Sequence, residues 1–135
     1  RSTRKESSAA SDVYKRQPFM LTQFLIPALL KSDDARIIFL SSTVGRKARA
    51  YWGAYSVSKF GIEGFAKTLS EELEKTQISV NTVNPGKLRT EMRRTAYPAE
   101  DSSTVPLPEE KSQAIVHLLS SSSLKINGEQ LTISD

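Results

Sequence analysis

The amino-acid sequence predicts an α/β fold with a parallel sheet, and two observations support this prediction. First, short β-branched runs alternate with longer stretches of helical periodicity. Second, residues 37–40 are apolar throughout, which is typical of a strand buried on both faces of a parallel sheet. With 135 residues, the chain is long enough for one domain or for part of a larger one.

The first half of the chain predicts a helix, a strand and a second helix. Residues 19–30 form an apolar segment whose large side chains recur on one helical face. A polar turn separates this segment from the strand at 36–40. A loop follows at 41–52 and leads into a long helix at 54–75, where apolar residues recur every four positions.

The second half of the chain predicts a strand, a helix and a last strand. Residues 78–83 form the second strand, which an Asn-Pro-Gly sequence ends. Residues 87–107 are expected to form a long irregular stretch. Pro108 suits the first turn of a helix, and an Asn-Gly turn precedes the last strand at 130–133. We therefore expect one sheet whose strands are joined by helices.

The composition excludes several classes of function. The chain has no cysteine, which excludes a disulfide scaffold, a thiolate metal site and a cysteine nucleophile. Its only histidine, His117, is expected to be a helix-surface or half-buried residue, so no metal site is predicted. No apolar run reaches the roughly 18 residues that a membrane-spanning helix needs. Because no secretory signal is present either, we expect a cytoplasmic protein without a membrane partner.

Most of the net positive charge lies in residues 1–17. This segment holds five basic and two acidic residues, so it accounts for +3 of the net charge of +4. The remaining 118 residues hold 14 basic and 13 acidic residues, a balance that does not suit the basic face of a nucleic-acid-binding domain. We therefore expect no nucleic-acid partner, and a basic-tailed nucleic-acid binder stays an alternative.

The same residues 1–17 lack helical and strand periodicity, so we expect an unstructured tail. Within it, residues 12–17, Asp-Val-Tyr-Lys-Arg-Gln, resemble the translation of a transposase end sequence used to prepare sequencing libraries. Our hypothesis is that the tail derives from an adaptor and that the natural sequence begins near Pro18. A transit peptide or a flexible arm is the alternative interpretation.

Tyr55 and Lys59 are the strongest candidates for chemistry. They are four residues apart on a predicted helix, so their side chains share one face. A nearby ammonium group favours the phenolate and lowers the pKa of a tyrosine, which is otherwise about 10. The pair is therefore a candidate general acid/base near neutral pH. A solvated helix face is the alternative interpretation.

Further polar residues stand where the predicted strands end. Ser41 and Ser42 follow the first strand, and Ser42 precedes Tyr55 by 13 residues. Asn84-Pro85-Gly86 ends the second strand, and Thr90 follows it. Open α/β sheets bind their ligands at the carboxyl ends of the strands. We therefore expect these residues and Tyr55 to meet in one crevice.

In the order and spacing of these motifs, residues 18–135 resemble the C-terminal half of a classical short-chain dehydrogenase/reductase. The stretch 45–55 is similar to that of the bacterial YciK-like oxidoreductases. The resemblance implies a three-layer α/β/α architecture, in which the chain forms the C-terminal part of a Rossmann-like, doubly wound, NAD(P)-binding domain. The matching motifs are Ser41-Ser42-Thr43-Val44-Gly45, Tyr55-Ser56-Val57-Ser58-Lys59, Val80-Asn81-Thr82-Val83-Asn84-Pro85-Gly86, Thr90 and Asn127-Gly128-Glu129-Gln130-Leu131.

The resemblance implies an oxidoreductase that interconverts a small-molecule carbonyl and alcohol with NAD or NADP. Tyr55 would exchange a proton with the substrate oxygen, and it is also one of the implied cofactor-binding residues. Lys59 would lower the pKa of Tyr55 and bind the nicotinamide ribose, and Ser42 would orient the substrate oxygen. The other implied cofactor-binding residues are Pro85 and Gly86 at the nicotinamide, and the Leu88 backbone and Thr90 at the carboxamide or phosphates. The choice between NAD and NADP stays open.

Three features of the family are absent from the sequence. They are the Gly-rich phosphate loop, the residue that selects between NAD and NADP, and an active-site Asn just before Phe19. All would precede Phe19, so we expect an N-terminally truncated fragment that does not hold dinucleotide phosphates by itself. The resemblance also implies a homo-oligomer at full length. A non-catalytic Rossmann-like binding or assembly domain is the alternative function.

The surroundings of the Tyr55–Lys59 pair leave alternatives open. Arg46, Lys47 and Arg49 are expected in a solvated loop, and contact with an anionic substrate or cofactor is the alternative. Trp52 either covers the substrate pocket or packs against its neighbours. Residues 91–105 correspond to the variable substrate loop of the family, a kind of loop that often acts as a lid.

Overall fold

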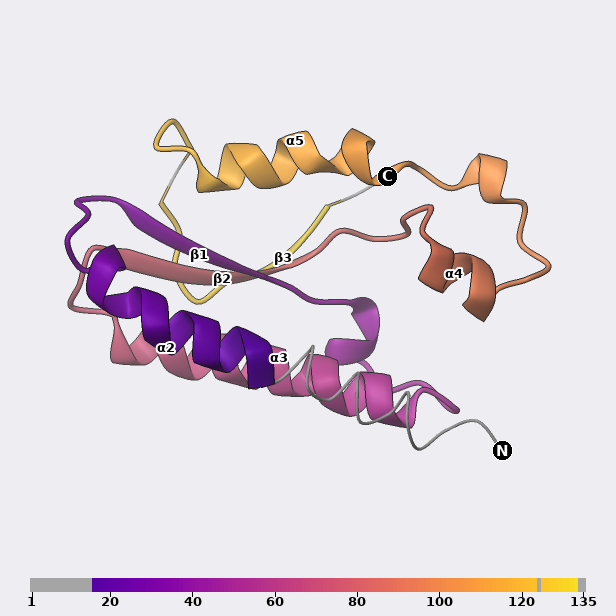
Figure 1. The fold of residues 1–135 in the computed structure, drawn as a ribbon, viewed down its shortest axis with the longest axis horizontal. Helices are drawn as coiled ribbons and strands as arrows, with labels where there is room; N and C mark the ends of the chain where they lie inside the picture. Colours follow the sequence, from indigo (N-terminus) through magenta and orange to yellow (C-terminus); the bar gives the residue numbers. More distant parts are fainter. Residues whose placement is uncertain (1–15, 124, 134–135) are drawn as a thin grey trace.

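Three parallel strands form the centre of the molecule, in the order β1-β2-β3 (Figure 1). This computed structural model of the chain describes residues 16–123 and 125–133. The strands are β1 (Ala35–Leu40), β2 (Ile78–Asn84) and β3 (Gln130–Thr132). The pairing of β1 with β2 begins at Ala35 and Ile78, and that of β2 with β3 at Thr82 and Gln130. The predicted parallel sheet is therefore confirmed, with strand bounds within one or two residues of those expected.

Helices cover both faces of this sheet, which gives three layers (Figure 1). Helices α2 and α3 lie side by side on one face, and α5 lies on the other. Their bounds are α2 (Gln17–Leu29), α3 (Gly53–Glu72) and α5 (Pro108–Leu119). Within residues 16–123 and 125–133, no helix combines the length and apolarity that crossing a membrane requires.

The core lies between the sheet and helix α3. Along α3, the buried residues Ile62, Ala66 and Leu69 recur at the three- and four-residue spacing of one helical face. They pack against Phe39 of β1 and Val80 of β2. Apart from Ala66, which has a single methyl group, each of these side chains contributes about 1.5–3 kcal/mol when it is fully buried. This packing fixes α3, and with it Tyr55 and Lys59, over the sheet.

The expectation that the first strand is buried on both faces was wrong. In β1, only Ala35 and Phe39 are buried, the three residues between them are half-buried, and Leu40 keeps 51% of its surface exposed. One face of β1 packs on the core through Ala35 and Phe39, whereas α5 covers the other face only in part. In contrast, every residue of β2 is buried. The continuous apolar run in β1 therefore did not mark the central strand of the sheet, which is β2.

The long irregular stretch expected at 87–107 contains two short helices. These are α4 (Glu91–Ala96) and the 3₁₀ turn η3 (Ser102–Thr104). The Thr90 hydroxyl caps α4 by accepting a hydrogen bond from the Arg93 N–H at 3.3 Å. A six-residue helix with no buried residue has no apolar periodicity to reveal it, so local polar caps define it instead.

The predicted tail, residues 1–17, lies outside the described residues except for its last two. Gln17 is the first residue of α2, and Arg16 precedes it at the N-cap position. The first helix thus begins two residues before its predicted start at Phe19. The long helix was predicted to reach residue 75, but α3 ends at Glu72.

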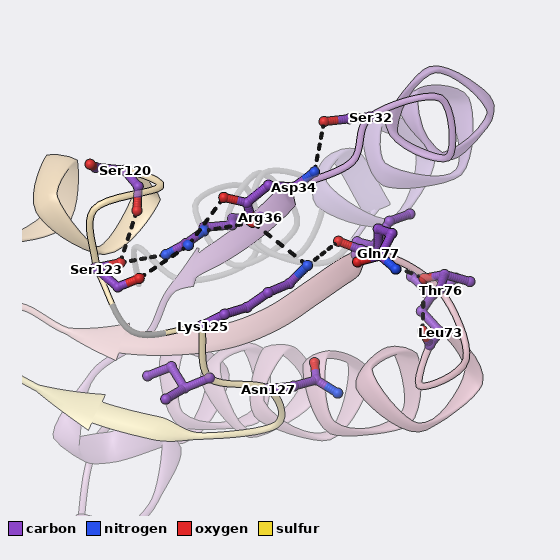
Figure 2. A network of polar contacts seen from close by, with 12 residues as sticks. Ser32, Asp34, Arg36, Leu73, Thr76, Gln77, Ser120, Ser123, Lys125 and Asn127 are labelled. Atoms are coloured by element: carbon purple, nitrogen blue, oxygen red, sulfur yellow. Dashed lines mark hydrogen bonds and ion pairs between the residues drawn. The ribbon is translucent and has the colours of Figure 1, made fainter.

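At the far end of the sheet from the candidate site, a polar network joins α5 to β1 (Figure 2). The Arg36 guanidinium donates to the carbonyls of Leu118 and Ser123, at 3.1 and 3.2 Å, and forms an ion pair with Asp34. The Arg36 side chain beside Asp34 lowers the pKa of that carboxyl group. The serine run that ends α5 therefore binds a strand arginine and holds the third layer in place.

Candidate active site

A cavity of about 980 Å³ lies beyond the carboxyl ends of β1 and β2. Its walls come from the segment after β1, the first turns of α3, the segment after β2, and α4 with the residues that follow it. This is the edge at which open α/β sheets place ligands. The structure brings all of the predicted site residues to this one cavity, namely Ser42, Tyr55, Lys59, Pro85, Gly86, Leu88 and Thr90.

Lys59 enters the cavity from helix α3, one turn after Tyr55. Only 5% of its surface is exposed, and its Nζ donates to the Leu40 carbonyl at 2.8 Å. The same Nζ lies 5.7 Å from the centre of the Tyr55 ring. Burial lowers the pKa of Lys59, and the nearby Glu63 carboxylate opposes this shift. The hydrogen bond to Leu40, the last residue of β1, thus holds the Lys59 ammonium group beside the Tyr55 ring.

Gly45 allows Lys59 to approach the segment after β1. This glycine lies in the 3₁₀ turn η2 (Thr43–Gly45), and its N–H donates to the Ser42 carbonyl at 2.9 Å. A Cβ atom at this position would lie 2.8 Å from the Lys59 Cβ and 2.9 Å from the Ser41 Oγ. Both distances are far shorter than van der Waals contact. A side chain here would therefore push α3 away from the serines.

The variant Gly45→Ala is expected to lower the free energy of unfolding by about 2 kcal/mol, as overpacking of a closed site does. Urea denaturation measures the change. The matched control is Gly53→Ala, where an added Cβ meets nothing within 4 Å, so stability should stay the same or rise slightly. Equal effects of the two substitutions would contradict the close approach at Gly45.

Asn84 organises the end of β2. Its Nδ2 donates to the Thr43 Oγ1 at 3.1 Å, and its Oδ1 accepts from the Gly86 N–H at 3.1 Å. Gly86 has a φ of 77°, a backbone conformation that favours glycine. These bonds join the segments after β1 and β2. They also explain why Pro85-Gly86 forms a fixed part of the cavity wall.

Arg89, which the sequence analysis did not single out, fixes the following segment. Its side chain donates to the carbonyls of Val105 and Ser103 at 2.9 and 3.0 Å, and its N–H donates to the Pro106 carbonyl at 2.8 Å. Leu88 and Thr90 are its neighbours in sequence and line the cavity. Hydrogen bonds to backbone carbonyls thus fix the path of this long irregular segment. Such bonds leave no pattern in the sequence, because every residue has a carbonyl group.

Arg49 and three aromatic rings connect the residues that precede and begin α3 with the residue that follows α4. The Trp52 ring packs edge-on against Tyr55 at 5.7 Å and lies 6.0 Å from the Tyr97 ring. The Arg49 guanidinium lies over both Trp52 and Tyr97, at 5.5 and 5.9 Å, and donates to the Tyr97 hydroxyl at 2.8 Å. Trp52 therefore packs against its neighbours, as one of the two alternatives proposed, and it also lines the cavity.

Arg46 corrects the expectation of a solvated loop. Its guanidinium forms an ion pair with Glu63 at 2.8 Å and donates to the Thr132 hydroxyl and the Leu131 carbonyl, both at 2.9 Å. The Thr82 hydroxyl donates to the same carboxylate at 2.7 Å. Arg46 thus joins α3, β2 and β3 and does not line the cavity. His117, in contrast, is exposed on α5 as expected.

Glu63 was missed although the sequence contained a signal for it. It follows Lys59 by four residues, so it lies on the face that carries the Tyr55–Lys59 pair. Burial opposes its negative charge, but the hydroxyls of Ser41 and Thr82 and the Arg46 guanidinium keep the pKa of Glu63 below its usual value. The sequence signal for this network was the four-residue spacing of Tyr55, Lys59 and Glu63, which places all three residues on one helical face.

Comparisons with known proteins found relatives of this chain both in sequence and in structure. The uncharacterized oxidoreductase YciK of Escherichia coli K12 is 50% identical over 90 residues, which are 67% of this chain and 35% of the relative. A short chain dehydrogenase from Salmonella enterica serovar Typhi matches in structure with a TM-score of 0.91 and 37% identity, over 98% of this chain and 54% of the other. One from Shigella flexneri, solved with NADP, has a TM-score of 0.85 and 39% identity, over 90% and 51%.

These relatives confirm the predicted YciK-like resemblance and the Rossmann-like fold class. The chain spans about half the length of the two matched structures and about a third of YciK. A family model described as short chain dehydrogenase matches residues 5–101. The chain therefore belongs to the short-chain dehydrogenase family.

Proposed function

We propose that the protein containing this chain is an NAD(P)-dependent oxidoreductase that interconverts a carbonyl and an alcohol. The observation that carries the proposal is the placement of Lys59 against the Tyr55 ring in the wall of a large cavity, which Ser42 also lines. A phenol and an ammonium group in this arrangement suit proton exchange with a substrate oxygen. The NADP present in the related Shigella flexneri structure supports the choice of coenzyme class.

The cavity residues fit the nicotinamide end of such a coenzyme. The buried Lys59 ammonium group offers a donor to ribose hydroxyls, and Gly86 offers a wall without a side chain. Pro85, Leu88 and Thr90 complete the residues that would hold this end. When bound, the coenzyme supplies or accepts the hydride. Since these 135 residues include no Gly-rich phosphate loop, we assign only the nicotinamide end to this cavity.

In carbonyl reduction, the Tyr55 hydroxyl donates a proton to the substrate oxygen as that oxygen gains negative charge. The Lys59 cation beside the ring favours the phenolate that remains. Ser42 donates a hydrogen bond that orients the same oxygen. In alcohol oxidation, the Tyr55 phenolate removes the proton instead. The chain thus supplies placement and proton transfer.

The direct test follows the absorbance of NADPH and NADH with a panel of aldehydes and ketones. We expect carbonyl-dependent oxidation of at least one coenzyme by the protein that contains this chain. Coenzyme binding without turnover of any carbonyl would reject the enzyme assignment and favour a non-catalytic binding domain. Binding is followed separately, by coenzyme fluorescence.

We also propose that the protein pairs with a second copy of itself through helices α2 and α3. Both helices expose large apolar side chains, with Phe24 80% and Leu21 59% exposed on α2, and Val57 58% exposed on α3. On α3, an added Cβ at Gly64 would meet nothing within 4 Å, which leaves room for a close neighbour. Apolar patches of this kind mark protein–protein contacts.

The variant Phe24→Glu is expected to convert the oligomer into monomers, because it places a charge in an apolar contact. Size-exclusion chromatography with light scattering measures the mass. The matched control is Val116→Glu on α5, which is also exposed, at 64%, and lies in the opposite layer. A monomeric unmodified protein, or equal effects of the two variants, would contradict the proposed contact.

A further inference from the structure

The three basic residues after β1 do not share one environment. Arg46 is turned into the fold and paired with Glu63. Lys47 and Arg49 instead line the cavity and are exposed. Neither forms an ion pair with any carboxylate in the described part of the chain. The cavity therefore receives two cations whose charge no described acid balances.

The other charges in the cavity wall do not offset these cations. Glu100 is the one acid in the wall, and it is already held by Arg93 through two hydrogen bonds of 2.6 and 2.7 Å. Lys87 also lies near Glu100 and favours its charged form. The cavity is thus strongly basic. Clefts lined by one sign of charge concentrate ligands of the opposite sign.

Arg49 is held in place and still has free donors. Its guanidinium stacks over Trp52 and Tyr97, and a single N–H donates to the Tyr97 hydroxyl. A guanidinium carries five N–H donors in a planar fork that matches a carboxylate or a phosphate. The other four N–H donors of Arg49 make no hydrogen bond to any of the described residues. Stacking on two rings also reduces the entropy that the side chain would lose on binding a ligand.

The position of Arg49 relates it to the reacting end of the substrate. Trp52 contacts both Arg49 and Tyr55, with its ring 5.5 Å from the guanidinium carbon and 5.7 Å from the Tyr55 ring. Arg49 is thus separated from Tyr55 by no more than these two contacts, and all three residues line the same cavity.

We propose that Arg49, with Lys47, binds an acidic group of the substrate, a carboxylate or a phosphate, so that the enzyme selects carbonyl compounds and alcohols carrying such a group. This proposal rests on the oxidoreductase function proposed above. Arg49 comes from the segment after β1, whereas the residues proposed to hold the nicotinamide follow β2, apart from Lys59 on α3. The acidic group is thus assigned to the substrate.

A matched pair of ketones tests the selection. The acid 4-oxocyclohexanecarboxylate and its methyl ester share one carbonyl and differ in charge. We expect the unmodified protein to reduce the acid with a kcat/KM at least about tenfold above that of the ester, as a hydrogen bond to a charged group provides. Arg49→Gln should lower kcat/KM for the acid about tenfold more than for the ester, and so abolish this preference. The control Lys67→Gln removes an exposed cation on α3 that does not line the cavity.

A binding measurement keeps the two proposals separate. Trp52 is the only tryptophan of the chain, and its fluorescence reports on the Arg49 stack. In the absence of coenzyme, the acid should quench this fluorescence saturably, the ester should not, and Arg49→Gln should remove the effect. Saturable binding of the acid without reduction of either ketone would reject the oxidoreductase function and leave the anion site supported.

Two results would overturn the anion site itself. One is an equal kcat/KM for acid and ester. The other is a weaker affinity of Arg49→Gln for NADPH with an unchanged preference for the acid, because Arg49 would then bind a phosphate of the coenzyme. Arg49→Lys should keep part of the preference, since it keeps the charge but loses the planar fork.

Discussion

Replacing Tyr55 by phenylalanine is expected to lower kcat for carbonyl reduction at least about 100-fold, the usual contribution of a general acid. The substitution removes one oxygen and keeps the ring, which packs edge-on against Trp52 and lies beside Lys59. The cavity wall therefore stays intact. Coenzyme affinity should change little, because Lys59 and the segment after β2 remain in place.

The matched control for this change is Tyr51→Phe. Tyr51 loses the same oxygen, but it is fully exposed and does not line the cavity. Its kcat and KM should equal those of the unmodified protein. If Tyr55→Phe kept near-normal turnover, the proposed proton transfer would be wrong. If it lost coenzyme binding as well, Tyr55 would have a binding role that the proposal does not give it.

The sequence predicted that these residues meet at one place because their positions depend on strand ends and helical spacing. Two β-like runs placed Ser42 and Pro85 at one edge of a parallel sheet, and a four-residue spacing placed Tyr55 and Lys59 on one face. Both rules follow from backbone geometry alone. The structure accordingly brings these residues to one cavity.

What the sequence did not reveal are interactions between distant polar residues. Arg46 looked like a loop residue, yet its partners Leu131 and Thr132 are more than 80 positions away. Arg89 binds backbone carbonyls, which every residue has, so its sequence neighbours gave no signal. In both cases the tertiary fold determines the hydrogen-bond partner of the arginine, whereas charge and local periodicity do not.

The variant Glu63→Gln is expected to lower the free energy of unfolding by about 3 kcal/mol at pH 7, the lower part of the range for breaking a buried ion pair. Glu63 is 5% exposed and accepts hydrogen bonds from Arg46, Thr82 and Gln130. Glutamine keeps the shape but leaves the Arg46 cation without its counter-charge. Urea denaturation measures the loss.

A matched Glu→Gln change separates burial from charge. Glu91 also pairs with an arginine, Arg94, at 2.6 Å, but both side chains are more than 70% exposed. Glu91→Gln should therefore leave the free energy of unfolding unchanged, since water screens exposed pairs. A loss in Glu91→Gln as large as that in Glu63→Gln would show that burial does not determine the effect.

The pH dependence of the Glu63→Gln effect follows from the lowered pKa of Glu63. Burial alone would raise that pKa, but the hydrogen bonds to the charged form outweigh burial and hold it below the usual value of 4.5. A carboxyl group with a depressed pKa in the fold stabilises the protein fully above its unfolded pKa, and this contribution is lost as the pH falls through the folded pKa. The stability difference between the unmodified protein and Glu63→Gln should therefore be constant above about pH 5 and shrink at lower pH. A difference that stayed constant down to acid pH would mean that packing around Glu63, and not its charge, holds α3 to the sheet beneath the Tyr55–Lys59 pair.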